Sequence, residues 1–168
     1  TDVGTLFAGD EENPAAFTWD PSDGEQLLFC PGTYYLQLNI ETDLKIKGLD
    51  DVILDGAGSA SVISVQGSEV DVRIENVEIT NGHGSGIFEE NDWSGFGGGV
   101  YCLGKENTIS VKDVAFTMNS AEGHGGGLSI MRCTTTIENS TFTYNRALYG
   151  GGLYIFDASV EVDNSIFE

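Results

Sequence analysis

The segment between residues 80 and 97 carries the side chains best suited to chemistry in this sequence. Its carboxylates are Glu89, Glu90 and Asp92, and its aromatic rings include Trp93 and Phe96. Carboxylate oxygens are good calcium ligands, and aromatic rings stack on the apolar faces of sugar rings. The acids therefore predict a candidate calcium site, and the two rings predict part of a ligand-binding surface. The alternative is that the rings only hold this segment against the fold while the acids stay solvated.

The same segment precedes a short apolar run that begins at Val100, so it is expected to overhang the outer face of a strand there. Alternation of apolar and polar residues places these uncharged side chains on the outer faces of equivalent strands: Asn39, Ser64, Tyr101, Ser129 and Tyr154. We expect Tyr101 and Tyr154 to bind a ligand together with Trp93 and Phe96. A glycoside hydrolase would need paired carboxylates on this face, and a lyase would need an acid cluster beside a basic residue. Neither pattern is found, so the sequence predicts no catalytic residues and argues against an enzyme.

The charge of the chain limits the kinds of molecule that it can bind. It has 27 acidic and 7 basic residues, which gives a formal net charge of −20. Such a surface repels nucleic acid and anionic membranes, attracts divalent cations and suits a high-salt exterior. The longest apolar runs are too short to span a bilayer. We therefore expect a secreted or cell-surface protein with no nucleic-acid partner, no membrane insertion and no required cofactor, with calcium as a candidate ligand.

The cysteines give no sign of a structural site. The chain has Cys30, Cys102 and Cys133, and no pair of them has the spacing of metal ligands. Cys102 aligns with apolar residues of other repeats and is expected to point inward as a small hydrophobic side chain. Cys133 falls in a turn of the next repeat. The sequence therefore predicts that these two cysteines are not bonded to each other.

A repeat of about 25 residues organises the chain. Gly-Gly-Gly runs at residues 97–99, 125–127 and 150–152 are each followed by an apolar residue. In step with them, these segments align without gaps: IENVEIT (74–80), VKDVAFT (111–117), IENSTFT (137–143) and VDNSIFE (162–168). Apolar residues alternate in short pairs within each repeat, which is the pattern of strands. An antiparallel sandwich also uses short strands, but it does not predict that like residues recur in register.

The repeat predicts an all-β parallel β-helix with three short strands per coil and about five to six coils. In this interpretation residues 1–168 form a single domain, with an N-terminal cap region at 1–35 and coils over 36–168. One interior column is expected to stack Phe116, Phe142 and Phe167. A second column, at the bend between the second and third strands, contains Asn76, Asp113, Asn139 and Asn164. These short polar side chains are expected to form a ladder, in which each one bonds backbone groups of its own bend and the equivalent side chain in the next coil.

The chain resembles a known family at the glycine runs and at Phe-x-x-Asn, which occurs at residues 116–119 and 142–145. From about Pro31 onward it is similar to the pectin-lyase-like right-handed β-helix superfamily. More narrowly, it resembles the repeat of chlamydial polymorphic outer membrane proteins, with Gly where that repeat usually has Ala. The resemblance implies a right-handed helix and a non-catalytic, adhesin-like surface or scaffold module. The fold also carries polysaccharide lyases and hydrolases, so a carbohydrate-active enzyme core, or a calcium- or glycan-binding module, is the alternative.

The last repeat is expected to leave one end of the solenoid open, because no polar cap follows Phe167 in the sequence. The face so exposed contains Ile155, Val160, Val162 and Phe167. An open last coil presents unpaired backbone groups beside an apolar core. We predict that this face associates with a copy of itself, end to end, in a two-fold symmetric homodimer. One alternative is that the final residues fold back over the face, and another is that the next coil of a longer natural protein takes that place. A glycan or cell-surface ligand is the other partner considered.

Overall fold

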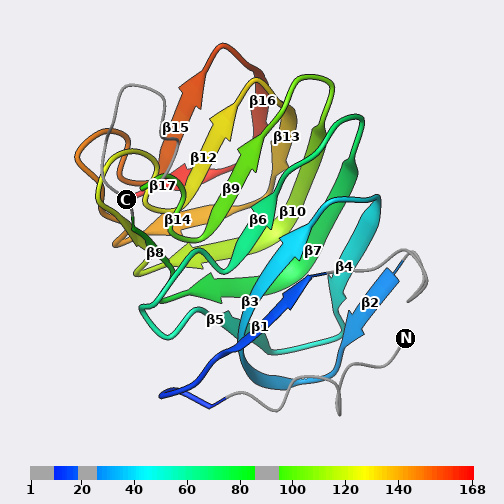
Figure 1. Ribbon diagram of the computed structural model, residues 1–168, viewed down its shortest axis with the longest axis vertical. Coiled ribbons are helices and arrows are strands. Elements are labelled where there is room, and N and C mark those ends of the chain that lie inside the picture. Colours follow the sequence, from blue (N-terminus) through cyan, green and yellow to red (C-terminus); the bar gives the residue numbers. More distant parts are fainter. Residues whose placement is uncertain (1–9, 19–25, 86–94) are drawn as a thin grey trace.

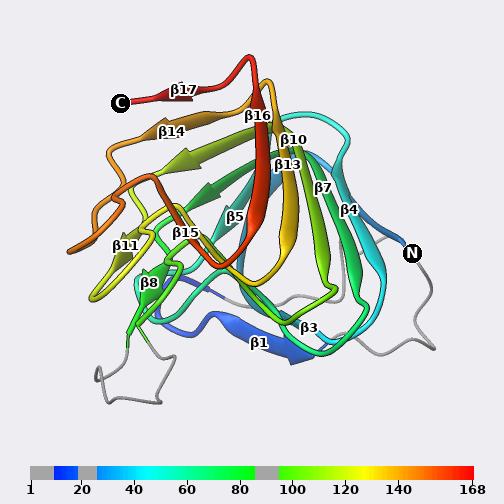
Figure 2. The ribbon, with the colours of Figure 1, turned by 90° about the horizontal axis from the view of Figure 1, so that it is seen from above.

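The computed structural model describes residues 10–18, 26–85 and 95–168, and these form strands and connections without a helix. The strands wrap around one apolar interior, and the view from above shows a nearly closed, solenoid-like sheet (Figure 1 and Figure 2). The pairings between strands in the described residues are parallel. In this part of the chain we find no helix of the length and apolar character needed to cross a bilayer.

The main sheet has two walls, which β3 joins because its two halves pair with different strands. The first wall contains β1 (Ala15–Thr18), β3 (Gly32–Ile40), β6 (Ile63–Val65), β9 (Val100–Leu103), β12 (Leu128–Met131) and β15 (Leu153–Phe156). The second wall contains β2 (Gln26–Phe29), β4 (Leu44–Gly48), β5 (Val52–Asp55), β7 (Asp71–Thr80), β10 (Thr108–Thr117), β13 (Thr134–Glu138), β14 (Thr141–Thr143), β16 (Ser159–Asp163) and β17 (Ile166–Phe167). A separate small sheet pairs β8 (His83–Gly84) with β11 (Ser120–Ala121).

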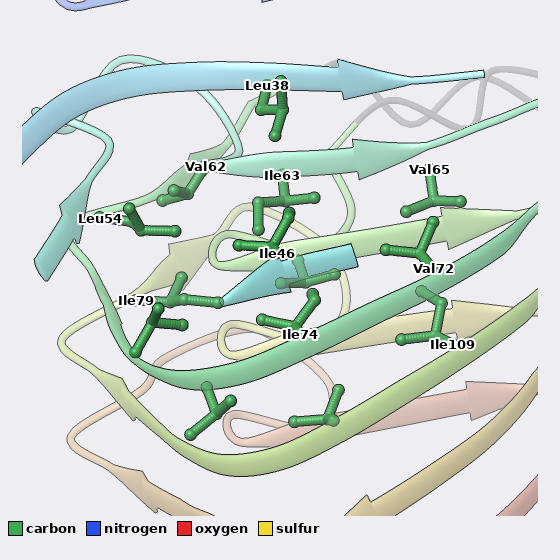
Figure 3. Packing of buried hydrophobic residues seen from close by; sticks show 14 of the residues in the cluster. Leu38, Ile46, Leu54, Val62, Ile63, Val65, Val72, Ile74, Ile79 and Ile109 are labelled. Carbon is green, nitrogen blue, oxygen red and sulfur yellow. The ribbon is translucent and has the colours of Figure 1, made fainter. Parts of the chain in front are cut away.

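The register of the strands matches the alignment of the repeats. Ile74 in β7 pairs with Val111 in β10, Val111 pairs with Ile137 in β13, and Ile137 pairs with Val162 in β16. Side chains alternate between the interior and the outer surface, as the buried and partly exposed residues of β4 show. Figure 3 shows the resulting core, in which these residues from both walls lie together: Leu38, Ile46, Leu54, Val62, Ile63, Val65, Val72, Ile74, Ile79 and Ile109.

Strand pairing begins earlier in the chain than residue 36. Strand β1 pairs with the second half of β3, β2 pairs with β4, and the first half of β3 pairs with β5. Leu27 and Phe29 of β2 are fully buried in the same core. Part of the segment predicted as an N-terminal cap therefore contributes paired strands and core residues.

The bends of the second wall, within β7 and β10 and between β13 and β14 and between β16 and β17, depend on a left-handed backbone conformation. In this conformation the φ angles are 55° for Asn76, 53° for Asp113, 49° for Asn139 and 46° for Asn164. Asn and Asp tolerate it better than other residues that have a Cβ atom. The Asn76 Nδ2 donates to the Gly48 carbonyl at 2.9 Å, but among the described residues no side-chain hydrogen bond joins members of this column to one another. The column predicted as a ladder therefore sets the direction of the chain at each bend.

Serine hydroxyls make the bonds across successive bends at this corner. The Ser140 amide donates to the Ser165 Oγ at 3.1 Å, and the Val114 amide donates to the Ser140 Oγ at 3.3 Å. Each hydroxyl also donates to a carbonyl two residues earlier in the chain, that of Glu138 or Asp163. Ser140 is buried at an interior position that holds Val114 one turn earlier, and these bonds satisfy its hydroxyl there.

The interior phenylalanine column is a continuous stack. The Phe142 ring lies parallel to Phe116 and to Phe167, with centroid distances of 4.5 Å and 4.4 Å. Phe116 and Phe142 are buried, whereas Phe167 is 45% exposed at the end of the stack. Register places Ile79 beneath Phe116, so the column is aromatic only over its last three turns.

The structure corrects the prediction for the cysteines, because Cys102 and Cys133 form a disulfide. Cys102 points inward from β9, as expected, and lies beside Ile130 of β12. Cys133 follows β12 in the bend that leads to β13, and its side chain is 1% exposed. Cys133 was expected in a turn of the next repeat, out of reach of Cys102. The bend instead directs Cys133 into the interior, with its Cα 6.4 Å from that of Cys102.

We expect Phe142→Ala to lower the free energy of unfolding by about 3–5 kcal/mol, since it removes the central ring of a packed stack. Phe167→Ala is the matched control, because the same truncation at the half-exposed end of the stack should cost clearly less. Denaturant unfolding followed by fluorescence or circular dichroism measures both. A loss below about 1 kcal/mol for Phe142→Ala would show that the ring does not pack as described.

The disulfide predicts that Cys102→Ala/Cys133→Ala lowers the free energy of unfolding by about 3–4 kcal/mol, because it opens a loop with a sequence separation of 31 residues. The Cys30→Ala variant is the control, since Cys30 is not part of this bond. Alkylation of the denatured but unreduced protein, followed by intact mass spectrometry, measures the bond directly. Labelling of all the cysteines without prior reduction would contradict it.

Candidate functional site

The outer face of the first wall carries the column in which a ligand-binding surface was expected. Register aligns these side chains in consecutive strands: Asn39, Ser64, Tyr101, Ser129 and Tyr154. The lower part of the column is polar, and the Ser64 hydroxyl donates to the Asn39 Oδ1 at 2.9 Å. The upper part is aromatic, with Ser129 buried between Tyr101 and Tyr154 in the register.

The glycine triplets bring a further set of side chains over this face. The first glycine of each triplet has a left-handed φ, which is 60° at Gly97, 67° at Gly125 and 63° at Gly150. The second glycine allows close contact between turns, because a Cβ atom on Gly98 would lie 2.1 Å from the Ser120 carbonyl oxygen. Each triplet therefore lets the connection lie flat against its neighbour and double back into the next strand. The residue before each triplet is placed over the outer face as a result.

Those preceding residues form a stack of rings outside the sheet. Phe96 stacks on His124 with a centroid distance of 4.7 Å, and His124 stacks on Tyr149 at 4.9 Å. Isolated parallel bridges connect the three residues in the same order. Tyr154 contacts the stack from the strand beneath, with its ring centroid 4.3 Å from that of His124. Each turn contributes one ring to this stack, as each of the last three turns contributes one phenylalanine to the interior column.

This ring stack covers the upper part of the outer face of the first wall. Phe96 and Tyr101 are only 5% and 7% exposed, and they form a second apolar cluster with the buried side chain of Met131. Their rings pack against protein and do not offer free faces to a sugar. Tyr154 is partly buried beside them, whereas Tyr149 is 57% exposed at the end of the stack. Of this set, Tyr149 therefore presents the most accessible aromatic surface.

The remaining predicted site residues cannot be placed. Trp93, Glu89, Glu90 and Asp92 lie outside the residues that the structure describes. Within the described ranges, no group of three or more His, Cys, Asp or Glu side chains is arranged to hold a metal ion. The calcium site and the contribution of Trp93 to a ligand surface stay predictions.

A buried amide ladder was missed by the sequence reasoning. The Asn119 Nδ2 donates to the Asn145 Oδ1 at 3.1 Å and to the Ile79 carbonyl at 2.8 Å, and Asn119 is fully buried. The Asn145 Nδ2 in turn donates to the Phe116 carbonyl at 2.9 Å. These are the asparagines of the Phe-x-x-Asn motif, so the motif itself was the signal. They satisfy backbone groups where the chain leaves the second wall, at a different bend from the predicted ladder.

A polar depression of about 340 Å³ lies beside this bend and includes Asp55, Asn81, His83 and Ser120 in its lining. The His83 Nδ1 and the Ser120 Oγ are 2.8 Å apart. The Asp55 carboxylate accepts hydrogen bonds from the Ala57 amide and from the Asn81 Nδ2. The acid is therefore used to shape the turn, and no hydrogen bond between it and His83 is found in the described residues.

The end of the solenoid formed by β15, β16 and β17 exposes apolar side chains. Strands β15 and β16 are the outermost members of the main sheet order, and in the described part of the chain β17 pairs with β14 alone. The exposed side chains are Ile155, Phe156, Val162, Ile166 and Phe167, each at least 44% exposed. Val160 is partly buried against the core beside them. We call this surface the end face, and Figure 2 shows the three strands β15, β16 and β17 that form it.

Comparison of the chain with family models, with curated proteins and with solved structures finds no match.

The ring stack predicts a pH dependence of stability. Burial lowers the pKa of His124, so the folded protein favours the neutral imidazole. The unfolded chain then binds more protons than the folded chain as the pH falls below the usual histidine pKa, and the stability due to this group is lost on acidification. His124→Phe keeps the ring but cannot titrate. Its melting temperature, measured relative to the parent from about pH 7.5 to about pH 5, should therefore rise toward acid pH. Parallel curves for the two proteins would contradict this.

Proposed function

We propose that this chain is a non-catalytic, adhesin-like extracellular scaffold module that associates with a second copy of itself through the end face. The observation that carries the proposal is the exposure of Ile155, Val162 and Phe167 beside open strand edges. Contiguous apolar surface of this kind marks interaction sites, and an unpaired edge is a template for further strand pairing. A two-fold contact between two such faces would remove both from water.

The proposal includes a right-handed parallel β-helix with three strands per coil and about five to six coils. The in-register columns of both walls support it, as does the tendency of parallel crossovers to be right-handed. A pectin-lyase-like relationship, with repeats like those of the chlamydial surface proteins, agrees with the Phe-x-x-Asn ladder at Asn119 and Asn145. The covered outer face of the first wall favours a structural over a catalytic use of this architecture.

A secreted or cell-surface location is part of the same proposal. The Cys102–Cys133 disulfide is of the kind that persists in oxidising compartments. The formal net charge of −20 supports an exterior location of high ionic strength and argues against nucleic acid as a partner. No resident cofactor is included, and calcium binding through Glu89, Glu90 and Asp92 is retained as a candidate property.

A glycan-binding module is the second candidate, and the exposed ring of Tyr149 favours it. This ring ends the outer stack on His124, so a sugar could stack on its free face as the next member of the column. Retention on a glycan column that Tyr149→Ala abolishes would support this candidate. Release of reducing or unsaturated ends from a polysaccharide would instead indicate the core of a carbohydrate-active enzyme.

Sedimentation equilibrium at about 1 M NaCl, where repulsion between acidic chains is screened, tests the self-association. We expect a dimer at micromolar concentration for the parent chain. Val162→Lys/Phe167→Lys should be monomeric, because it would bury like charges in the contact. Leu49→Lys is the matched control, since it places lysine on an exposed apolar residue of the β4–β5 connection. The control should dimerise like the parent, and a parent that stays monomeric at high concentration would disprove the proposal.

A further inference from the structure

The sequence contains one Asn-x-Ser/Thr motif, which the proposed function does not use. It consists of Asn139, Ser140 and Thr141, and no other asparagine of the sequence is followed two residues later by serine or threonine. This motif is the acceptor sequence for N-linked glycans in secreted proteins, provided that the middle residue is not proline. Three residues match such a motif often by chance, so its use depends on where the fold places their side chains.

The side chains of the motif alternate between the outer surface and the core. Asn139 is exposed at the bend between β13 and β14, and Thr141 at the start of β14 is partly exposed. Ser140, the middle residue, is 1% exposed at an interior position. The asparagine amide and the threonine hydroxyl, which the motif specifies, therefore lie on the same outer surface. Register places Asp113 and Asn164 beside Asn139 in the turns before and after, so its exposure does not arise at an end of the solenoid.

The side-chain amide of Asn139 is not used by the fold. The backbone N–H of Asn139 donates to the Asp163 carbonyl at 3.1 Å, but its side chain makes no hydrogen bond within the described part of the chain. In this it differs from Asn76, at the equivalent bend of an earlier turn, whose Nδ2 donates to the Gly48 carbonyl at 2.9 Å. A sugar attached to Nδ2 of Asn139 would therefore displace no hydrogen bond of the folded protein and would extend into solvent.

The conformation of the bend does not by itself require the motif. Asp113 takes the same left-handed conformation as Asn139, with φ angles of 53° and 49°, so the bend accepts a carboxylate in place of the amide. In the last turn Asn164 also has a left-handed φ, of 46°, but Ile166 pairs with Thr141 in the register. The neighbouring turns therefore form the same corner without the complete motif.

We propose that Asn139 carries an N-linked glycan. The proposal rests on the secreted or cell-surface location proposed above, and the Cys102–Cys133 disulfide is of the kind that forms in the same oxidising compartments. The donor is a lipid-linked oligosaccharide phosphate. Transfer forms a bond between Nδ2 of Asn139 and the anomeric carbon of the sugar, and breaks the bond between that carbon and a phosphate oxygen of the donor. The amide gives up one proton, and the lipid phosphate is the leaving group.

The experiment secretes the chain from cultured eukaryotic cells behind an added secretion signal. Its intact mass is measured before and after peptide N-glycosidase, which removes the glycan and leaves aspartate in place of the asparagine. We expect most parent chains to carry one glycan. Thr141→Ala should abolish the modification, whereas Thr141→Ser keeps a hydroxyl at that position and should retain it. Asn139→Asp should also abolish it, and its melting temperature should equal that of the enzymatically deglycosylated parent, because Asp113 already occupies the equivalent bend.

The outcomes separate this proposal from the location on which it rests. A secreted parent with an intact disulfide and no glycan would overturn the modification and leave the extracellular location standing. Asn139→Asp/Ile166→Thr is the control for the host, because it moves the complete motif one turn along the same column. A glycan that persists in Thr141→Ala would lie elsewhere and would also overturn the assignment to Asn139. A parent retained in the cells with Cys102 and Cys133 reduced would overturn the location instead.

Discussion

Parallel stacking in register is the constraint from which the rest of this structure follows. Each residue of a strand lies beside its counterpart in the neighbouring turn. A column of identical side chains is therefore stable only where like side chains pack favourably against each other. Apolar and aromatic residues do so readily, and Phe116, Phe142 and Phe167 stack face to face. Charges do not, and the outer column from Lys47 to Glu138 alternates in sign. Backbone groups at the bends are satisfied by amides and hydroxyls that repeat from turn to turn.

The same constraint operates outside the sheet. Glycine triplets allow the connections to lie against one another, and the stacked rings of Phe96, His124 and Tyr149 are the result. The outer face of the first wall thus becomes a second packed layer in its upper part. If the connections pointed away from the sheet, this face would be exposed to solvent. The rings that the connections carry cover it instead. The part of the expected ligand-binding surface formed by Phe96 and Tyr101 therefore contributes mainly to packing.

Local alternation and recurrence were enough to predict the parallel strands, their register and the phenylalanine column, because these depend on residues within single strands. The bends were harder to predict. Cys133 was assigned to a turn and was therefore not expected to bond to Cys102, but a tight bend can direct a side chain inward, where the two cysteines meet. The ladder was also predicted at one bend only, whereas two bends use asparagine in different ways: Asn76 for its left-handed backbone, and Asn119 for hydrogen bonds. Side-chain direction at a bend depends on φ and on the neighbouring turn, which the residue pattern alone does not contain.

The disulfide has a mechanical consequence for a solenoid. Tension applied along such a fold peels turns from an end, one after another, because each turn is bonded only to its neighbours. The covalent link between the β9 strand and the bend after β12 makes two adjacent turns a closed loop. Unravelling from either end stops on reaching this loop, and the residues within it add no length to the extended chain. Under load, the segments on either side of this loop can lengthen, whereas the loop closed by the disulfide cannot.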